Sequence, residues 1–417
     1  MRIARELHLQ KLIGAQHNGL IKVITGMRRC GKSYLLNELF RDYLLHQGID
    51  DGHILRLAFD MRSNHSLRDP DALCDFVRER TSAPGMHYLL LDEIQLVEDF
   101  EGVLNDFLHS PNLDVYVTGS NSRFLSSDII TEFRGRGYEI HLQPLSFAEF
   151  LSAQSQDRQQ AWNSYLLYGG MPFLFNLQSD EQKADYLKRL FAEVYKRYIT
   201  DRYRIRMPDE LDRIVSILAS SVGSLTSPVK LSKTFESMAR RSISSSTITR
   251  YCGYLEDAFL VSRVKRFDLR GKRYIGTLYK YYFQDIGLRN AHLNFRQYEE
   301  SHLMENVIYN ELLLRGYNVD VGIVEGRQTF PDGHSQRQTY EIDFVANLGS
   351  RRYYIQSALQ MPTADKREQE NRPLRKTGDA FRKIIVTGDH TPLWHNEDGH
   401  TIINVLDFLL RPDSLDL

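Results

Sequence analysis

A glycine-rich segment near the start of the chain has the residue types and spacing of a phosphate-binding loop. Gly26 is followed by four residues and then by Gly31, Lys32 and Ser33. Glycines let the backbone curl so that successive N–H groups point at phosphate oxygens. A lysine at this spacing reaches the β- and γ-phosphates, and the serine hydroxyl ligates Mg²⁺. We therefore expect ATP with Mg²⁺ to bind here. The residues predicted to contact the nucleotide are Gly26, Met27, Arg28, Arg29, Cys30, Gly31, Lys32, Ser33 and Tyr34.

Two carboxylates, Asp92 and Glu93, end the apolar run in the segment LLLDEIQ. At the carboxyl end of a strand beside the loop, Asp92 could hold Mg²⁺ through water and Glu93 could polarise the attacking water. The alternative is an acidic cap on the following helix. The presence of the loop favours the first interpretation, so Ser33 and Asp92 are the expected metal ligands.

Further candidates for catalysis follow the next apolar run, DVYVTGSNS. Ser120 or Asn121 could orient the water or touch the γ-phosphate, and each could equally be a capping residue. Arg134 and Arg136 flank Gly135, and a loop arginine directed at the γ-phosphate of a neighbouring subunit would act as an arginine finger. The alternative is a solvated surface arginine. The predicted catalytic residues are Glu93, Asn121, Arg134 and Arg136.

The elements that must position these groups are indicated by the apolar runs themselves. Continuous apolar runs alternate with helical spacing over the first 150 residues, and this pattern is typical of a parallel sheet covered on both faces. We therefore expect an α/β fold in this part of the chain. The expected strands are Leu20–Thr25, His53–Asp60, Tyr88–Glu93 and Asp114–Ser120.

The middle of the chain carries a concentration of positive charge. Residues 226–282 contain 12 Lys and Arg against 4 Asp and Glu, a local net charge of +8 in a chain whose formal net charge is -1. Two helices joined by a turn near Ser242–Ser245 are expected there, and the second, from about Ser245 to Asp257, could enter the major groove of DNA. The alternative is a structural or protein-docking role. The predicted DNA contacts are Arg240, Arg241, Arg250, Lys265, Arg266, Lys272 and Arg273.

The order of acidic residues near the end of the chain resembles that of a PD-(D/E)xK nuclease. A helical Glu305 is followed by Glu341 and Asp343 on one expected strand. The next strand carries Gln356 and Ala358 where such nucleases have an acidic residue and a lysine. A metal-dependent nuclease needs the charge of both groups. We therefore interpret Glu305, Asp343 and Gln356 as a degenerate site.

Several of these segments together resemble a family of prokaryotic AAA+ ATPases with a C-terminal restriction-endonuclease-like domain of unknown function. They are GMRRCGKSYLL, LLLDEIQ, TGSNSRFL, RGRGYEIHLQPLSFAEF, YGGMPF, SISSSTITRYCGYLEDAFLV, KYYFQDIGLRN, LMENVIYNELLLRGY and EIDFVA. The resemblance implies ATP binding at Gly26–Ser33, a metal role for Asp92 and a catalytic role for Glu93. It also implies a winged-helix-like segment. We expect an AAA-type ATPase core over residues 1–150, a helical lid over 151–205, the winged-helix-like segment over 206–295, and an inactive endonuclease-like α/β domain over 296–417.

Composition narrows the classes of function. Three cysteines (Cys30, Cys74 and Cys252) without paired spacing argue against a disulfide framework or a zinc knuckle. No apolar run approaches the roughly 20 residues that span a bilayer, so a cytoplasmic protein without a membrane partner is expected. The leading hypothesis is a slow Mg²⁺-dependent ATPase whose nucleotide state controls a protein or DNA partner, as a homo-oligomer if a finger acts in trans. The alternatives are a nucleotide-gated binding module without turnover and, less favoured, an ATP-dependent nuclease.

Overall fold

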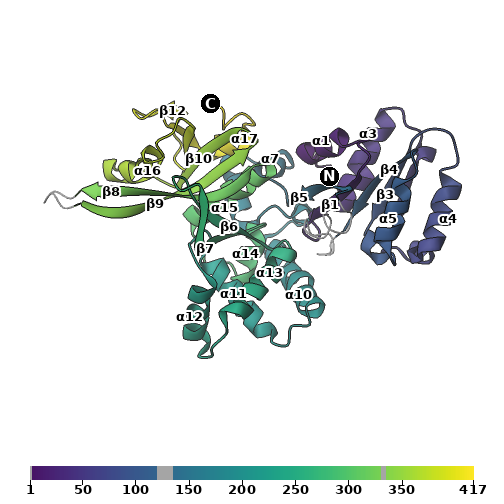
Figure 1. Cartoon of the computed structure of the whole chain (residues 1–417), viewed down its shortest axis with the longest axis horizontal. Coiled ribbons are helices and arrows are strands. Elements are labelled where there is room, and N and C mark those ends of the chain that lie inside the picture. The colour runs from purple at the N-terminus through teal and green to yellow at the C-terminus, as the bar shows by residue number, and fades with distance from the viewer. Residues whose placement is uncertain (1, 120–134, 330–334) are drawn as a thin grey trace. The chain divides into compact units, whose positions relative to one another are not determined.

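The computed structural model describes residues 2–119, 135–329 and 335–417 of the chain. It divides into two compact units, Met1–Leu145 and Ser146–Leu417 (Figure 1). The predicted roles of Ser120, Asn121 and Arg134 fall outside the described residues. Among the helices that are described, none is both long and apolar enough to cross a bilayer.

The first unit is built on a parallel sheet of five strands in the order β2-β3-β4-β1-β5. This confirms the predicted α/β class. The edge strand β5 was not expected, because polar Glu139 and His141 interrupt its apolar pattern; both lie at hydrogen-bond distance from Thr25 Oγ1 (2.7 and 3.1 Å). The strands are β1 (Ile21–Gly26), β2 (Ile54–Ala58), β3 (His87–Asp92), β4 (Leu113–Thr118) and β5 (Gly137–Leu142).

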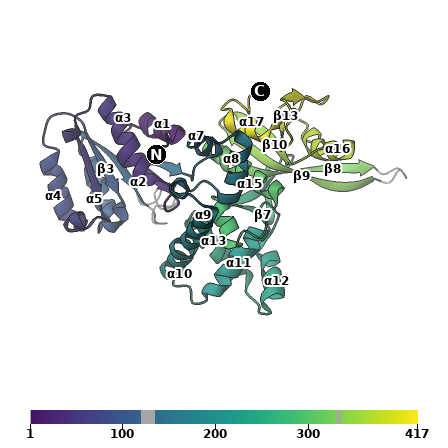
Figure 2. The same cartoon turned by 180° about the vertical axis from the view of Figure 1, so that it is seen from behind.

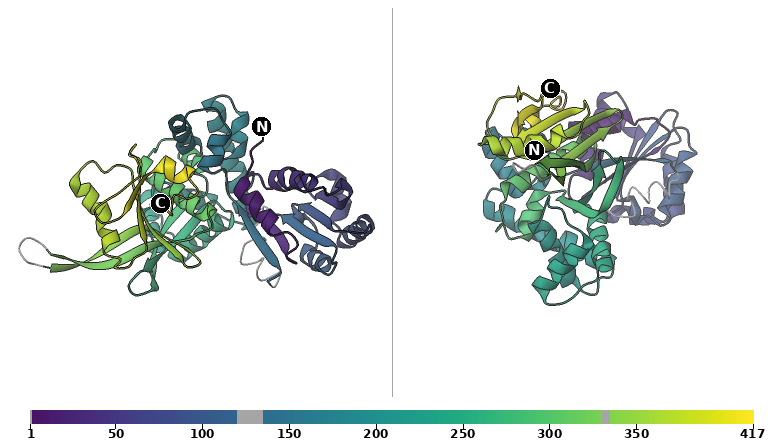
Figure 3. Two further views of the ribbon diagram at one scale, coloured as in Figure 1. Left: turned by 90° about the horizontal axis from the view of Figure 1, so that it is seen from above. Right: turned by 60° about the vertical axis from the view of Figure 1, so that its left-hand side comes forward.

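Helices cover both faces of this sheet, as the apolar strands require. Figure 3 shows helices on both sides of the sheet. Alternate residues such as Val23, Leu89 and Val117 pack with apolar residues of α4 and α5 in one core. On the other face, the ring of Phe40 lies 4.5 Å from that of Tyr116. Phe40 belongs to a continuous helix made of α2 (Lys32–Tyr34), the wider π-helical η1 (Leu35–Phe40) and α3 (Arg41–His46). The other elements are α1 (Glu6–Gly14), η2 (Asp51–His53), η3 (Arg62–Arg68), α4 (Pro70–Arg80), η4 (Ile94–Leu96) and α5 (Phe100–Leu108).

A buried ion pair joins β1 to β4 within this sheet. Lys22 is fully buried and its ammonium contacts the carboxylate of Asp114. The hydroxyl of Tyr116 (2.7 Å) and the backbone N–H of His17 (3.2 Å) also donate to Asp114. Burial lowers the pKa of Lys22, and Asp114 opposes that shift. The pair thus holds the strand that leads into the glycine-rich loop against its neighbour.

The second unit contains an eight-stranded sheet in the order β12-β13-β11-β10-β9-β8-β6-β7 (Figure 2). The β6–β7 hairpin turns around Arg270–Lys272, and β6 pairs in parallel with β8. The sheet therefore continues across the boundary predicted near residue 295, and the predicted division of this unit stays a prediction. The strands are β6 (Val261–Asp268), β7 (Arg273–Phe283), β8 (Asn318–Thr329), β9 (Ser335–Leu348), β10 (Arg351–Ala358), β11 (Arg382–Thr387), β12 (Trp394–His395) and β13 (Thr401–Asn404).

The helices of the second unit include the expected pair α12 and α13. The closing apolar run INVLDFLL would fit a strand throughout, but only its first two residues belong to β13 and the rest forms α17. The side chain of Asn404 accepts a hydrogen bond from the N–H of Leu406 (2.8 Å) and so starts a helix. The helices are α7 (Phe147–Ser152), α8 (Arg158–Tyr168), η6 (Pro172–Asn176), α9 (Asp180–Arg189), η7 (Leu190–Lys196), α10 (Arg197–Arg202), α11 (Pro208–Ser220), α12 (Pro228–Ala239), α13 (Ser245–Asp257), α14 (Ile286–His292), α15 (Glu300–Leu314), α16 (Ala364–Arg375) and α17 (Val405–Leu410).

Candidate functional site

The glycine-rich loop joins the end of β1 to the start of α2. Gly26 and Gly31 have φ angles of 137° and 106°, which a residue with a side chain rarely adopts. A Cβ on Gly26 would lie 2.1 Å from the carbonyl oxygen of Leu142, so β5 also excludes a side chain there. The ammonium of Lys32 donates to the carbonyl oxygens of Gly26 (3.0 Å) and Met27 (2.9 Å). The loop is therefore a curled segment that ends at a helix N-terminus.

Residues from outside the loop brace it. The guanidinium of Arg5 donates to the carbonyl oxygens of Cys30 (3.3 Å) and Gln143. The thiol of Cys30 is buried and donates to the carbonyl oxygen of Leu142 (3.4 Å). Arg5 lies far from the loop in sequence and was missed, because its partners are backbone carbonyls that no pattern of side chains reveals.

The predicted nucleotide contacts differ in exposure. The side chains of Met27 and Cys30 are fully buried, so only their backbone could face a phosphate. Arg28 is half-buried and Arg29 is exposed, with a φ of 65°. The hydroxyl of Tyr34 accepts a hydrogen bond from the N–H of Ile3 (3.3 Å).

Asp92 and Ser33 lie together at the carboxyl edge of the sheet, where β3 and β4 end. Asp92 is 5% exposed, and it accepts hydrogen bonds from the hydroxyls of Thr118 and Ser33. The backbone N–H of Glu93 donates to Thr118 Oγ1 (3.0 Å). Burial raises the pKa of Asp92, and the two hydroxyl donors oppose that shift. Thr118 was not selected from the sequence, although it precedes the chosen Ser120 and Asn121 by only two and three residues.

Glu93 follows Asp92 in a strained backbone conformation. Its φ of 55° turns the chain sharply out of β3. Its carboxylate accepts a hydrogen bond from the side-chain amide of Gln95, a second residue that sequence reasoning missed. The carboxylate is thus held by its own segment of chain, two residues away.

The structure does not bring Arg136 to the glycine-rich loop of the same chain. Its carbonyl oxygen accepts from the N–H of Ile21 (2.9 Å), at the amino end of β1, and its exposed guanidinium donates to Asn105 Oδ1 (3.3 Å). The loop follows the other end of β1, roughly 16 Å away at about 3.3 Å per residue.

The residues present fit a nucleotide with Mg²⁺. Lys32 and the helix N-terminus supply positive charge, and the paired Ser33 hydroxyl and Asp92 carboxylate are oxygen ligands of the kind that Mg²⁺ prefers. Within the described part of the chain, no group of three or more His, Cys, Asp and Glu is arranged to hold a metal ion. A bound Mg²⁺ would therefore depend on phosphate oxygens and water for most of its ligands.

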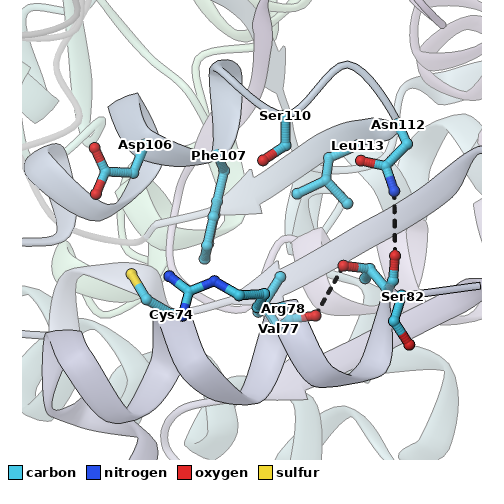
Figure 4. Close-up of a pocket in the computed structure, with 10 residues that line it drawn as sticks. Cys74, Val77, Arg78, Ser82, Asp106, Phe107, Ser110, Asn112 and Leu113 are labelled. Carbon is cyan, nitrogen blue, oxygen red and sulfur yellow. Dashed lines mark hydrogen bonds between the residues drawn. The ribbon is translucent and has the colours of Figure 1, made fainter.

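A separate pocket of about 310 Å³ lies between α4 and α5 (Figure 4). Leu113, at the amino end of β4, lines it, whereas Thr118 at the carboxyl end belongs to the site above. The amide of Asn112 donates to the carbonyl oxygen of Thr81 (3.1 Å) at its wall. This pocket contains none of the residues predicted from the sequence.

The predicted DNA contacts occupy two groups of elements. Arg240 and Arg241 directly follow the last residue of α12. Arg250 lies on α13 and is exposed. Lys265 and Arg266 lie on β6. Lys272 lies in the turn that follows this strand, and Arg273 is the first residue of β7. The turn is anchored away from the helix pair, because Leu269 packs in a core with Val324 and Ile342 of β8 and β9. The structure therefore does not gather all seven residues at one point.

The three residues of the predicted degenerate nuclease site do come together. Glu305 lies on α15, Asp343 on β9 and Gln356 on β10. The N–H of Asp343 donates to Gln356 Oε1 (3.1 Å). The ammonium of Lys280 on β7 donates to Glu305 Oε1 (2.8 Å) and Asp343 Oδ1 (3.1 Å). Lys280 was missed, although a lysine inside the apolar, aromatic run LYKYYF signals a buried partner.

Comparisons with known proteins identify the family. The AAA domain matches residues 18–151, and a domain of unknown function (DUF8612) matches residues 159–299. An uncharacterized protein of Haemophilus influenzae is 36% identical over 416 residues, which cover 98% of this chain and 99% of that protein. An uncharacterized protein of Methanocaldococcus jannaschii is 26% identical over 404 residues, 93% of this chain and 85% of that protein. Among solved structures, a Walker-type ATPase of Pyrococcus abyssi has 14% identity and a TM-score of 0.48, covering 70% of this chain and 96% of that chain.

The match to the AAA domain confirms the AAA part of the resemblance, while the winged-helix-like and restriction-endonuclease-like parts stay predictions. The AAA match spans the glycine-rich loop and the Asp92–Glu93 pair. The chain therefore belongs to the same family as the Haemophilus influenzae protein, and its residues 18–151 form an AAA domain.

Proposed function

We propose that this protein binds ATP with Mg²⁺, hydrolyses it slowly, and uses its nucleotide state to control a partner. The observation that carries the proposal is the hydrogen-bonded set Ser33, Asp92, Thr118 and Glu93 at the carboxyl ends of β3 and β4. A site that only bound ATP with Mg²⁺ would use Ser33 and Asp92 but would not need a second acidic residue beside them. Hydrolysis needs such a residue to accept a proton from the attacking water.

Each side chain of this set has a distinct task in the proposed reaction. Lys32 exchanges its two carbonyl partners for oxygens of the β- and γ-phosphates. Ser33 and Asp92 hold Mg²⁺, which would neutralise charge on the phosphates. Glu93 accepts a proton from the attacking water, and Thr118 fixes Asp92 and the backbone of Glu93 relative to each other. These roles follow the general chemistry of P-loop NTPases.

The slow, switch-like character is supported by two observations. Gln95 donates to one carboxylate oxygen of Glu93, so the orientation of the proposed base depends on its own segment of chain. Arg136 lies at the edge of the sheet opposite the loop, and it could act as a finger only on a second copy of the chain. Both features suit an enzyme whose turnover waits for a partner or for assembly. The alternative, a gated binding module without turnover, shares the same ATP site.

Replacing Lys32 by Ala is expected to abolish ATP binding and phosphate release, because it removes the positive charge that reaches the β- and γ-phosphates. ATP affinity is measured by calorimetry with Mg²⁺, and phosphate release by a coupled assay. Arg78→Ala, which removes a cation from the exposed face of α4, serves as the control and should retain both properties. Unchanged ATP affinity in Lys32→Ala would contradict the proposed site.

We propose DNA as the partner, and helix α13 has a surface that suits DNA binding. Its buried side includes Ile248 and Leu255, and its other side exposes Ser246, Thr249 and Arg250. Short hydroxyl side chains beside an arginine on one helix face are groups that bind phosphates and base edges. Because the chain as a whole is close to neutral, any such contact depends on this local surface.

Arg250→Glu is therefore expected to weaken duplex DNA binding about tenfold and to lower the slope of log K against log salt by about 1. Fluorescence anisotropy with a labelled duplex at several salt concentrations measures both quantities. Arg78→Glu makes the same charge change in the other unit and should leave both values unaltered. If Arg250→Glu binds DNA as the wild type does, α13 is not a DNA contact and a protein becomes the expected partner.

A further inference from the structure

A buried lysine occupies the centre of an acidic cluster in the second unit. Lys280 on β7 is 3% exposed. Its Nζ lies 2.8 Å from Glu305 Oε1, 3.0 Å from Glu341 Oε1 and 3.1 Å from Asp343 Oδ1. An ammonium has three protons to donate, so each proton has one carboxylate as its partner.

The three carboxylates come from elements that pack together for other reasons. Glu341 and Asp343 lie two residues apart on β9 and so share one face of the sheet. Glu305 comes from α15, which packs against β7, β8 and β10. Lys280 comes from β7, at the far edge of the same sheet. No local stretch of sequence contains this cluster.

The carboxylates are fixed by further donors. The hydroxyl of Tyr282 donates to Glu305 Oε1 (2.6 Å), and the N–H of Ser357 donates to Asp343 Oδ2 (3.0 Å). A Cβ on Gly223 would lie 3.1 Å from Glu305 Oε1, so the chain after α11 lies against this carboxylate. The cluster is thus a fixed, largely buried cage of oxygens around one cation.

We infer that the ammonium of Lys280 occupies the point on which the carboxylates of Glu305, Glu341 and Asp343 converge, so that these carboxylates are not arranged to hold a metal ion while the lysine is in place. Carboxylates from a helix and a neighbouring strand that converge on one point are the usual ligands of Mg²⁺ or Mn²⁺. Here the same point holds Nζ, and a metal could enter only by displacing it. This inference concerns the second unit and does not depend on the proposed ATPase.

Charge supports an ammonium at this position. Burial would lower the pKa of Lys280, but the surrounding Tyr282, Glu305, Asp343 and Glu341 hold it well above its usual value. Burial raises the pKa of Glu305 to about 7. The contact with Lys280 opposes that shift, as expected for a carboxylate that accepts a hydrogen bond from an ammonium.

The neutral amide of Gln356 also favours an ammonium over a divalent ion at this position. Its Oε1 accepts the N–H of Asp343, and its Nε2 donates to Glu370 Oε2 (3.2 Å). A carboxylate in this position would add a fourth negative charge and favour a divalent ion. Both departures from the nuclease pattern, the amide and the inserted lysine, reduce the need for a metal. DNA held by this unit would then remain uncut.

The inference is tested with Mn²⁺ and the full-length protein carrying Asp92→Asn, so that the ATP site adds no Mg²⁺-type ligand. In this background Mn²⁺ is expected not to raise the melting temperature, because Lys280 fills the site. In Lys280→Met, Mn²⁺ at about 100 times its Kd is expected to raise it by about 5 °C. Lys280→Met/Asp343→Asn should lose that rise. The matched control is Lys265→Met, which replaces an exposed lysine of the neighbouring strand β6. Mn²⁺ should not raise the melting temperature of this control.

Two results would overturn the inference. One is a folded Lys280→Met variant that binds no Mn²⁺. The other is a stoichiometric Mn²⁺ ion, counted by electron paramagnetic resonance, that is present with Lys280 intact and lost in Asp343→Asn. In that case the metal coexists with the lysine, and the two cations form a nuclease-type centre. The comparison of Mn²⁺ content with and without Asp343→Asn keeps Lys280, so it remains informative even if Lys280→Met fails to fold.

Discussion

Glu93→Gln is expected to lower the rate of phosphate release by about 10²–10⁴-fold, the usual contribution of a general base, and to leave ATP affinity within about twofold of the wild-type value. An amide cannot accept the proton of the attacking water, but it has nearly the shape of the carboxylate. Nucleotide binding is unaffected, because Lys32, Ser33 and Asp92 remain in place. The carboxylate also lies half-buried beside Gln95, where an amide side chain fits without a new charge.

Single-turnover phosphate release and calorimetric titration with ATP and Mg²⁺ separate the two quantities. Glu98→Gln is the matched control, because it makes the same substitution at an exposed position five residues further along the chain. Glu98→Gln should behave as the wild type in both assays. Equal phosphate release from wild type and Glu93→Gln would leave the binding module without turnover as the function of this site.

Lys22→Met is expected to destabilise the first unit by about 3–5 kcal/mol, the usual cost of removing one partner of a buried ion pair. The methionine side chain fills most of the lysine's volume. The effect therefore comes from Asp114, which loses its buried cation and, among the described residues, keeps Tyr116 and His17 as hydrogen-bond donors. The loss should be measured as a lower midpoint in urea and in thermal unfolding.

The chain has two units, so the transition that belongs to the first must be identified. ATP binds the folded first unit and raises the midpoint of that transition alone. Lys22→Met should lower the ATP-sensitive midpoint and leave the other unchanged. The double variant Lys22→Met/Asp114→Asn removes both charges and is expected to recover at least half of the loss. No recovery would mean that the stabilising effect of Lys22 lies in packing against the ring of Tyr116.

The arrangement of the proposed nucleotide site could be predicted from the sequence because its parts are local. The loop follows a strand, and a parallel strand brings its last residues to one edge of the sheet. Asp92 therefore had to lie near Ser33 once the parallel sheet was predicted. Thr118 follows from the same rule, since it ends β4. The sequence pattern did not reveal its role, because Thr118 lies inside the strand and the polar residues Ser120 and Asn121 follow it.

Other contacts had no local signal. Arg5 supports the loop through backbone carbonyls that are 25 and 138 residues away in sequence. Lys280 meets carboxylates 25 and 63 residues further along the chain. Such pairs depend on how the sheet is ordered, and the position of β7 at its edge could not be obtained from apolar periodicity. The edge strand β5 was not predicted for a different reason. Its polar residues Glu139 and His141, which contact Thr25 Oγ1, interrupt the apolar pattern of the strand.

The eight-stranded sheet of the second unit has a consequence for how this protein can change over evolution. The β6–β7 hairpin pairs with β8 and carries Lys280 into the carboxylates of α15 and β9. A gene fusion or deletion that separated the segments on either side of residue 295 would expose the edge of β8 and leave buried Glu305 and the partly buried Glu341 and Asp343 without their cation. The two segments are therefore bound to be inherited, duplicated and lost as one piece, whatever their separate origins.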